Sequence, residues 1–212
     1  MINQKLSPLQ YICKMNDTYK TIDGIAEGWY KEKMSKFIAY AIPVSTVEEA
    51  KEQIEKYQKQ YYDARHVCWA YMLGHERNEF RSNDNGEPSG TAGKPILGQI
   101  NSNELTNILI VVIRYFGGVK LGTSGLIVAY REAAAEAISN SNIIECLVED
   151  DITVAFEYPF MNDIMRIVKE MEPTIVYQLF DMNCEMTLRI RRSEMPNLRG
   201  RLEKVESAFI KE

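Results

Sequence analysis

The chain of 212 residues is 45% hydrophobic and 26% charged, a composition that favours one large globular domain or two small ones and excludes a disordered or low-complexity protein. Its formal net charge of −5 disfavours a large electrostatic footprint on nucleic acid, because nonspecific affinity for phosphate comes from excess Lys and Arg. The longest aliphatic run, Ile108 to Ile113, has six residues, far below the roughly 18 that cross a bilayer, and no apolar segment follows the first five residues. We therefore expect a cytoplasmic protein with no membrane span and no secretory signal.

Cysteine and histidine are sparse. The four cysteines, at positions 13, 68, 146 and 184, form no Cys-x-x-Cys pair, and there are two histidines. Scattered cysteines in a chain of this size are typical of reduced thiols, and the lack of clustered ligands disfavours a structural zinc site. We expect no metal and no cofactor.

The first strand and helix signals lie between residues 37 and 62. Phe37–Ile42 is typical of a strand, and Pro43 follows where a ladder donor is no longer needed. Ser45 and Glu48 have the spacing of a capping box, which predicts a helix that starts there and ends near Tyr62.

The middle of the chain predicts the centre of a sheet. His66–Leu73 and Leu105–Tyr115 are rich in apolar residues, and the β-branched content of the second indicates a strand buried on both faces. Helices are expected over Pro95–Asn101 and over the alanine-rich Ser124–Asn140, which should pack closely on the sheet.

Beyond Ile144 the pattern restarts as a strand–helix–strand–strand–helix run. A boundary is expected between Asn140 and Glu145, where polar residues cluster, which divides the chain into domains 1–140 and 145–212. A last short strand over Ser207–Ile210 would complete a split-βαβ, ferredoxin-like unit. The elements expected in this half are strands Val148–Phe156, Thr174–Phe180 and Glu185–Arg191 and helices Phe160–Met171 and Glu194–Glu206.

Eight of the twelve glycines fall between Gly86 and Gly125, in two groups. The first group lies in Ser82–Pro95, where Asn-Gly permits positive φ and each proline fixes the backbone. This segment supplies carboxylates, hydroxyls, a cation and backbone donors, and the N-terminus of the helix from Pro95 should face it. Such a stretch is more useful as a binding site than as core.

The second group lies in Arg114–Gly125, between a buried strand and a helix start. That arrangement presents free amides to a phosphate or carboxylate. The segment matches neither a Walker A loop nor a Gly-x-Gly-x-x-Gly fingerprint, which disfavours an ATPase or a nicotinamide enzyme. The alternative is that these glycines only permit tight turns and close helix–sheet packing.

Several side chains near the glycine groups could take part in catalysis or binding, and each also has a purely structural explanation. His66 and Cys68 share a strand face as a conceivable nucleophilic pair, although a buried cysteine more often acts as a small hydrophobe. Asp84 and Glu87 have the chemistry of an acid/base pair or of magnesium ligands, although capping of turns is the more common role of such residues. The ligand-binding residues we expect are His66, Asp84, Glu87, Ser89, Thr91, Lys94, Arg114, Gly117, Gly118 and Lys120.

Three motifs, in order along the chain, carry a resemblance to a known family. They are Ala64-x-His66-x-Cys68-x-Ala70-Tyr71, Asp84-x-Gly86-Glu87-Pro88-Ser89-Gly90-Thr91-Ala92-Gly93-x-Pro95-Ile96-Leu97 and Arg114-Tyr115-Phe116-Gly117-Gly118-x-Lys120-Leu121-Gly122-x-x-Gly125-Leu126-x-x-Ala129-Tyr130. Together they resemble the signature of the IMPACT/YigZ family. The resemblance implies an α+β protein of two domains: an N-terminal sheet with helices like ribosomal protein S5 domain 2, and a tail like the ferredoxin-like C-terminal domain of bacterial YigZ proteins, itself similar to domains of elongation factor G.

The chain departs from the family pattern at two places. The family usually has Ser-Asp-Asp-Gly-Glu-Pro, whereas Asn83 and Asn85 stand in place of the serine and the second aspartate. The lost carboxylate weighs against a two-Asp metal site. Ser124 occupies a position where glycine is common.

The resemblance implies a link to translation. Eukaryotic IMPACT members regulate translation during amino-acid starvation through an extra N-terminal partner-binding domain, which we do not expect in a chain of this length. For bacterial YigZ-like members no reaction is established, and their domain types recur in RNA- and ribosome-associated proteins. We therefore expect a non-catalytic protein that binds RNA, the ribosome or a translation factor where the two glycine groups meet, with Lys94, Arg114 and Lys120 as local cations.

Two rival functions follow from other features. An enzyme acting on a small anionic metabolite would use His66, Asp84 or Glu87 in acid/base roles and loop amides to hold the anion. A protein-interaction scaffold would use the ferredoxin-like sheet, and its mark would be an exposed apolar sheet face.

Overall fold

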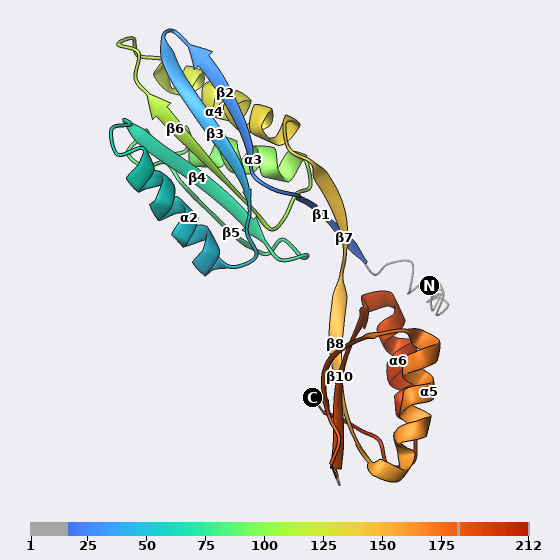
Figure 1. Cartoon of the computed structure of the whole chain (residues 1–212). Helices are drawn as coiled ribbons and strands as arrows, with labels where there is room; N and C mark the ends of the chain where they lie inside the picture. Colours follow the sequence, from blue (N-terminus) through green and yellow to red (C-terminus); the bar gives the residue numbers. More distant parts are fainter. Residues whose placement is uncertain (1–16, 182, 212) are drawn as a thin grey trace, which may run out of the picture. The chain divides into compact units, whose positions relative to one another are not determined.

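The computed structural model describes residues 17–181 and 183–211, and divides the chain into two compact units (Figure 1). The larger unit is Tyr19–Cys146; the smaller is Leu147–Glu212 together with Met1–Thr18. The expectation of no secretory signal, and Cys13, fall outside the described residues. None of the described helices has the length and hydropathy that a membrane span requires.

The larger unit is built on a five-stranded antiparallel sheet with the order β2-β3-β6-β4-β5. Its strands are β2 (Ala26–Glu32), β3 (Ser35–Pro43), β4 (His66–Leu73), β5 (Glu79–Asn83) and β6 (Ile108–Tyr115), and its helices are α2 (Val47–Gln60), α3 (Gly93–Ser102) and α4 (Gly122–Ser139). Two further strands, β1 (Thr18–Ile22) and β7 (Ile143–Leu147), pair with each other in a separate two-stranded sheet.

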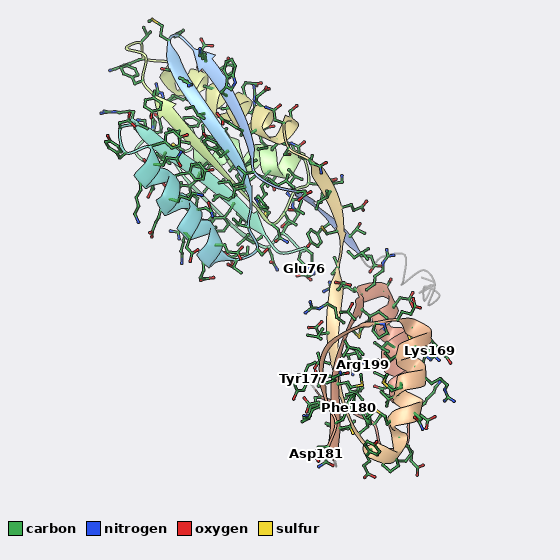
Figure 2. All side chains as sticks on the ribbon, viewed as in Figure 1. Glu76, Lys169, Tyr177, Phe180, Asp181 and Arg199 are labelled. Atoms are coloured by element: carbon green, nitrogen blue, oxygen red, sulfur yellow. The ribbon has the colours of Figure 1, made fainter. Side chains whose placement is uncertain are left out.

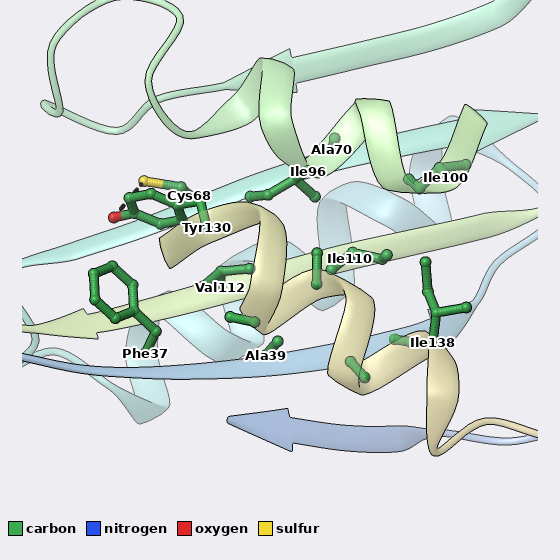
Figure 3. Close-up of a cluster of buried hydrophobic side chains, with 14 of the residues drawn as sticks. Phe37, Ala39, Cys68, Ala70, Ile96, Ile100, Ile110, Val112, Tyr130 and Ile138 are labelled. Atoms are coloured by element: carbon green, nitrogen blue, oxygen red, sulfur yellow. Dashed lines mark hydrogen bonds between the residues drawn. The ribbon is translucent and has the colours of Figure 1, made fainter. Parts of the chain in front are cut away.

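Strand β6 lies at the centre of this sheet and is buried on both faces, as its β-branched sequence predicts. All six side chains from Ile108 to Ile113 are fully buried. They alternate between two core clusters, because successive side chains of a strand point to opposite faces. Ile110 and Val112 pack with α3 and α4 on one face (Figure 3), and Leu109 and Val111 pack with α2 on the other. The unit therefore has three layers, with the sheet between helices.

The capping box of α2 lies one residue later than the sequence predicts. The N-cap is Thr46, whose hydroxyl accepts a hydrogen bond from the Glu49 amide at 3.1 Å, and the Glu49 carboxylate in turn accepts one from the Ser45 amide at 2.6 Å. The expected pair of Ser45 and Glu48 was wrong because the Ser-Thr and Glu-Glu repeats offer the same spacing in two registers.

Strands β2 and β5 were not anticipated, because each lies at an edge and carries charged residues. Strand β2 also contains Gly28, where a Cβ would lie 2.2 Å from the Ala137 amide nitrogen of α4. The alanine-rich helix thus packs directly on the backbone of the strand, which is the close packing expected of Ser124–Asn140.

The smaller unit has the connectivity βαββαβ, with all strand pairs antiparallel in the order β11-β8-β10-β9. Its core gathers the inward side chains of β8 and β10 against both helices. This agrees with the expected run, including the last short strand. The elements are β8 (Glu149–Glu157), α5 (Met161–Met171), β9 (Thr174–Leu179), β10 (Asn183–Arg191), α6 (Met195–Leu202) and β11 (Phe209–Lys211), with short 3₁₀ turns at Tyr158–Phe160 and Arg192–Glu194.

The chain is therefore an α+β protein of two units, as expected. The division between them follows Cys146 rather than falling between Asn140 and Glu145. Strand β7 explains the difference: it begins at Ile143 and pairs with β1, so the polar residues before it form a turn inside the larger unit.

Candidate functional site

The two glycine-rich segments meet at one pocket of the larger unit, with a volume of about 580 Å³. The first segment contributes Glu87 and Pro88, and the second contributes the end of β6 and the start of α4. Strand β4 adds His66. The full lining is Arg65, His66, Glu87, Pro88, Arg114, Phe116, Lys120, Leu121, Gly122, Thr123 and Leu126.

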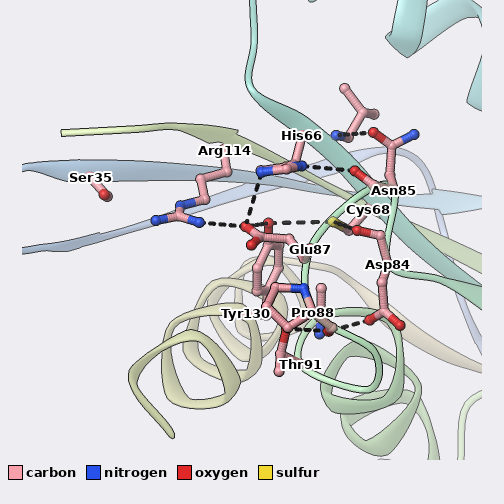
Figure 4. A network of polar contacts seen from close by, with 12 residues as sticks. Ser35, His66, Cys68, Asp84, Asn85, Glu87, Pro88, Thr91, Arg114 and Tyr130 are labelled. Atoms are coloured by element: carbon pink, nitrogen blue, oxygen red, sulfur yellow. Dashed lines mark hydrogen bonds and ion pairs between the residues drawn. The ribbon is translucent and has the colours of Figure 1, made fainter. Parts of the chain in front are cut away.

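Glu87 is the centre of a polar network at this pocket (Figure 4). Its residue is only 8% exposed, and its Oε1 accepts hydrogen bonds from Arg114 Nη1 at 2.6 Å and from the Tyr130 hydroxyl at 2.8 Å. His66 Nε2 lies 3.8 Å from the same oxygen. A buried carboxylate is stable only with such partners. Since all three contacts reach Oε1, Oε2 has no hydrogen bond to any described residue.

His66 is oriented by the loop it faces. Its Nδ1 lies 2.8 Å from the carbonyl oxygen of Asn85. A carbonyl oxygen only accepts, so Nδ1 carries the proton and donates it. In neutral His66 the Nε2 atom is therefore an acceptor, and protonation would convert its contact with Glu87 into an ion pair.

Arg114 is a buried cation with one unpaired donor. The residue is 5% exposed, and its guanidinium lies over the rings of Phe37 and Phe116 at 5.5 and 5.6 Å from their centroids. Nη1 donates to Glu87, but Nε is buried without a partner among the described groups. Such an unpaired buried donor is rare, and binding of an anion is one role that explains it.

The start of α4 adds positive potential to the same pocket. Gly122 and Thr123, in its first turn, line the pocket, and the helix has neither a side-chain cap nor an acidic residue there. The aligned peptide dipoles place partial positive charge at such an end. Lys120 precedes the helix, and Phe116, 48% exposed, supplies an aromatic wall.

Asp84 organises the first glycine-rich segment instead of facing a ligand. Its carboxylate accepts hydrogen bonds from the amides of Gly90, Ala92 and Gly93 at 2.8 to 2.9 Å, the last two at the start of α3. Burial tends to raise the pKa of Asp84, but these three amide donors outweigh it and hold the pKa below its ordinary value. The structural alternative, in which such an acid caps a turn, therefore describes Asp84, and its carboxylate occupies the amides that the enzyme alternative would use for an anion.

Cys68 is not an activated nucleophile. Burial raises the pKa of its thiol to about 12, and the thiol donates to the Asp84 carbonyl oxygen at 2.9 Å. Its sulfur lies 3.3 Å from the Tyr130 hydroxyl, whose pKa burial also raises. Cys68 is therefore better described as a small buried hydrophobic residue than as a nucleophile.

Gly117 and Gly118 have backbone roles. A Cβ on Gly117 would lie 2.1 Å from the carbonyl carbon of Met34, and the Gly117 amide donates to the Ser35 hydroxyl at 3.1 Å. Gly118 has φ of +87°, which favours glycine. Close packing for Gly117 and a positive φ for Gly118 therefore explain why these positions hold glycine.

Comparison with known proteins fits these motifs. The Impact N-terminal domain family matches residues 33–138, which contain every residue of the pocket. The chain belongs to the IMPACT family. Relatives of this IMPACT chain include the IMPACT family member YvyE of Bacillus subtilis, 33% identical over 85% of this chain and 83% of that protein. Another is the IMPACT family member YigZ of Escherichia coli, 33% identical over 70% of this chain and 75% of that protein.

One solved structure extends the likeness to both units of this IMPACT chain. It is a crystal structure of a hypothetical protein that matches with a TM-score of 0.73 and 25% identity, over 92% of this chain and 97% of that one. The likeness agrees with the two-unit fold described above.

Of the ten site residues expected from the sequence of this IMPACT chain, four line the pocket: His66, Glu87, Arg114 and Lys120. Asp84 and Thr91 stabilise the loop, since the Thr91 hydroxyl donates to the Pro88 carbonyl at 2.6 Å. The other four expected residues, Ser89, Lys94, Gly117 and Gly118, do not line the pocket. Sequence reasoning missed Tyr130, whose place in the helical repeat indicated only core.

No metal site is apparent in the described parts of this IMPACT chain. Within residues 17–181 and 183–211, no three side chains of His, Cys, Asp or Glu gather in a way that could hold an ion. Asp84 and Glu87 accept from different partners, loop amides for Asp84 and Arg114 for Glu87.

Proposed function

We propose that this IMPACT family member is a cytoplasmic, translation-linked regulatory protein that binds RNA through the pocket beside Glu87. The observation that carries the proposal is Arg114, which is buried and whose Nε donor has no partner among the described groups. A phosphate oxygen is a strong acceptor for a guanidinium. The RNA backbone would supply it.

The electrostatics of the pocket favour a small anionic group. Glu87 offsets the charge of Arg114, but Lys120, Arg65 and the start of α4 remain as positive contributions. This positive spot is local, since the whole chain has a net charge of −5. A short single-stranded segment therefore fits better than a long duplex, whose affinity would need a wide basic surface.

The size and wall of the pocket suit one nucleotide. Its volume of about 580 Å³ lies in the range of pockets for small molecules. Phe116 offers an exposed ring, and bases stack on such rings with little regard for sequence. Membership of the IMPACT family, whose resemblance implies translational regulation, supports the choice of RNA over other phosphorylated ligands.

The proposal is tested by RNA binding with matched lysine variants. Fluorescence anisotropy of a labelled single-stranded RNA should show affinity that falls severalfold in Lys120→Ala, with a salt slope smaller by about one. Lys94→Ala is the control, because Lys94 is an exposed cation of the first glycine-rich segment that does not line the pocket. Absence of RNA binding and of ribosome co-sedimentation, or equal losses in both variants, would refute it.

A second candidate function, an enzyme acting on a small anionic metabolite, is favoured by one contact. His66 Nε2 and Glu87 Oε1 lie 3.8 Å apart at the pocket, a distance at which a proton could pass through a bound group. Thermal-shift screening with phosphorylated metabolites separates the two functions. A metabolite that raises the melting temperature and is turned over by the wild type, but not by Glu87→Gln, would favour the enzyme.

A further inference from the structure

Strand β9 is an unprotected edge of the smaller unit. It ends the sheet order β11-β8-β10-β9, so it pairs with β10 alone among the described strands. All six of its residues, Thr174–Leu179, are exposed, and the helices leave it uncovered on both faces. The apolar side chains of Ile175, Val176, Tyr177 and Leu179 are 39 to 48% exposed, and Phe180 follows at 46%.

The composition of β9 differs from that of the other exposed strand edges. The segment Thr-Ile-Val-Tyr-Gln-Leu contains no charged residue and no proline. Every other edge strand among the described residues carries a charge, which is a common defence against pairing with another chain. These charges are Lys20 in β1, Glu27, Lys31 and Glu32 in β2, Glu79 and Arg81 in β5, Glu145 in β7 and Lys211 in β11.

We propose that β9 is an association surface for a second copy of this chain, in which two β9 strands pair antiparallel across a two-fold axis. Antiparallel pairing gives each open row of backbone N–H and C=O groups its complement. It also places one uncharged apolar strand against an identical one, so no like charges meet within the paired strands. The two four-stranded sheets would then form one continuous sheet.

A second copy fits this edge better than an unrelated strand. A foreign strand is usually selected by charges or side-chain pockets, and β9 has no charge with which to select one. Figure 2 shows Tyr177 at the sheet of this unit, across from Lys169 on α5, so the apolar edge is not part of the helical surface. A single strand pair buries less than a standard interface, so the association is weak and depends on concentration.

The charge of the unit sets the salt dependence. Residues 147–212 carry 13 acidic and 9 basic side chains, so two copies repel each other at low salt. Salt screens this repulsion and leaves the hydrogen bonds and apolar contacts of the strand pair in place. Self-association through β9 should therefore strengthen as salt rises, whereas RNA binding at the pocket should weaken, which separates the two proposals.

The test is the mass of the full-length chain in solution. Sedimentation equilibrium over a hundredfold range of concentration should show the mass rising from 24.4 kDa towards twice that value, more so at high salt. Val176→Lys places a charge on the edge and should leave the protein monomeric. Phe209→Lys, on the opposite edge of the same sheet and 66% exposed, is the matched control and should associate like the wild type.

Hydrogen exchange identifies the surface used. Amides of β9 should become more protected as concentration rises, and those of β11 should not. A wild type that stays monomeric, equal loss of association in both variants, or β9 protection that is independent of concentration would overturn the proposal. The last result would mean that another part of the same chain covers the edge.

Discussion

Glu87 and Arg114 form an ion pair whose side chains are 3% and 7% exposed, and burial gives the pair its importance. Removing either partner leaves the other charge largely shielded from water, which costs far more than the pair itself contributes. Tyr130 adds a third group to the network through its hydrogen bond to Glu87. The three residues therefore depend on one another for stability as well as for the shape of the pocket.

We predict that Glu87→Met and Arg114→Met each lower the free energy of unfolding of the larger unit by about 3–5 kcal/mol. The double variant should lose clearly less free energy of unfolding than the sum of the two single losses, because it leaves neither charge unpaired. Urea unfolding followed by tryptophan fluorescence measures this, since both tryptophans, Trp29 and Trp69, lie in the larger unit. Additive losses would show that the pair is not coupled.

Asp84 makes the stability of the first glycine-rich segment depend on pH. Because the pKa of Asp84 is below its ordinary value of 3.8 in the folded chain, the ionised carboxylate contributes stability that is present above 3.8. That contribution is lost as pH falls through the folded pKa. Asp84→Asn should lower the free energy of unfolding by about 2 kcal/mol at neutral pH, since hydrogen bonds to a charged group are lost.

The difference between wild type and Asp84→Asn should shrink as pH falls below 3.8. Tryptophan-detected unfolding across the acid range measures it. Asp63→Asn is a useful comparison, because Asp63 is an exposed carboxylate that accepts from the Tyr115 hydroxyl and, among the described residues, from no loop amide. A constant difference at all pH values would contradict the role given to Asp84.

At the level of single residues, the sequence indicated which side chains carry functional groups but not the direction in which each side chain points. Both acids of the first glycine-rich segment looked equivalent as site residues. The positive φ of Asn85 and Gly86 turns the chain between them, so Asp84 faces the amides of its own loop and Glu87 faces Arg114. That direction depends on the strand from which Arg114 comes, 27 residues later in the chain, and no local pattern contains it.

The second glycine-rich segment shows how two adjacent glycines differ within one element. Gly117 packs against the backbone of the β2–β3 turn, where an added Cβ would overlap the Met34 carbonyl carbon. Gly118 has open space around its Cα but a positive φ. Glycine is required at position 117 because the β2–β3 turn lies against it, and it is favoured at position 118 because the backbone there has a positive φ.

We predict that Gly117→Ala is the more damaging of two neighbouring substitutions. It must move the β2–β3 turn or the loop, at about 3 kcal/mol or more, whereas Gly118→Ala meets only the strain of its φ, at about 1–2 kcal/mol. Thermal unfolding monitored by tryptophan fluorescence compares the two. Equal losses would mean that the loop yields easily and that Gly117 is not a fixed contact.

Elements with strong periodicity were predictable, and those that depend on neighbours were not. Strand β6 and the helical repeat of α4 follow from their own side chains. Strands β1, β2 and β5 form because a partner strand supplies hydrogen bonds. Their exposed polar residues give a sequence pattern that is typical of loops.

At the scale of the whole molecule, the two units have separate cores. The larger unit buries one cluster on each face of its sheet, and the smaller unit buries its own cluster between β8, β10 and the helices. No residue that the structure describes belongs to the core of both units. Each unit therefore has the means to unfold on its own.

We predict two unfolding transitions that a single substitution can separate. Tryptophan fluorescence reports the larger unit, and far-ultraviolet circular dichroism reports both, so the two probes should give different midpoints in urea. Glu87→Met should move the fluorescence transition to lower urea and leave the remaining dichroism transition unchanged. Leu188→Ala, in the buried core of the smaller unit, should do the reverse, at about 2–5 kcal/mol. If either variant shifted both transitions together, the units would fold as one cooperative body.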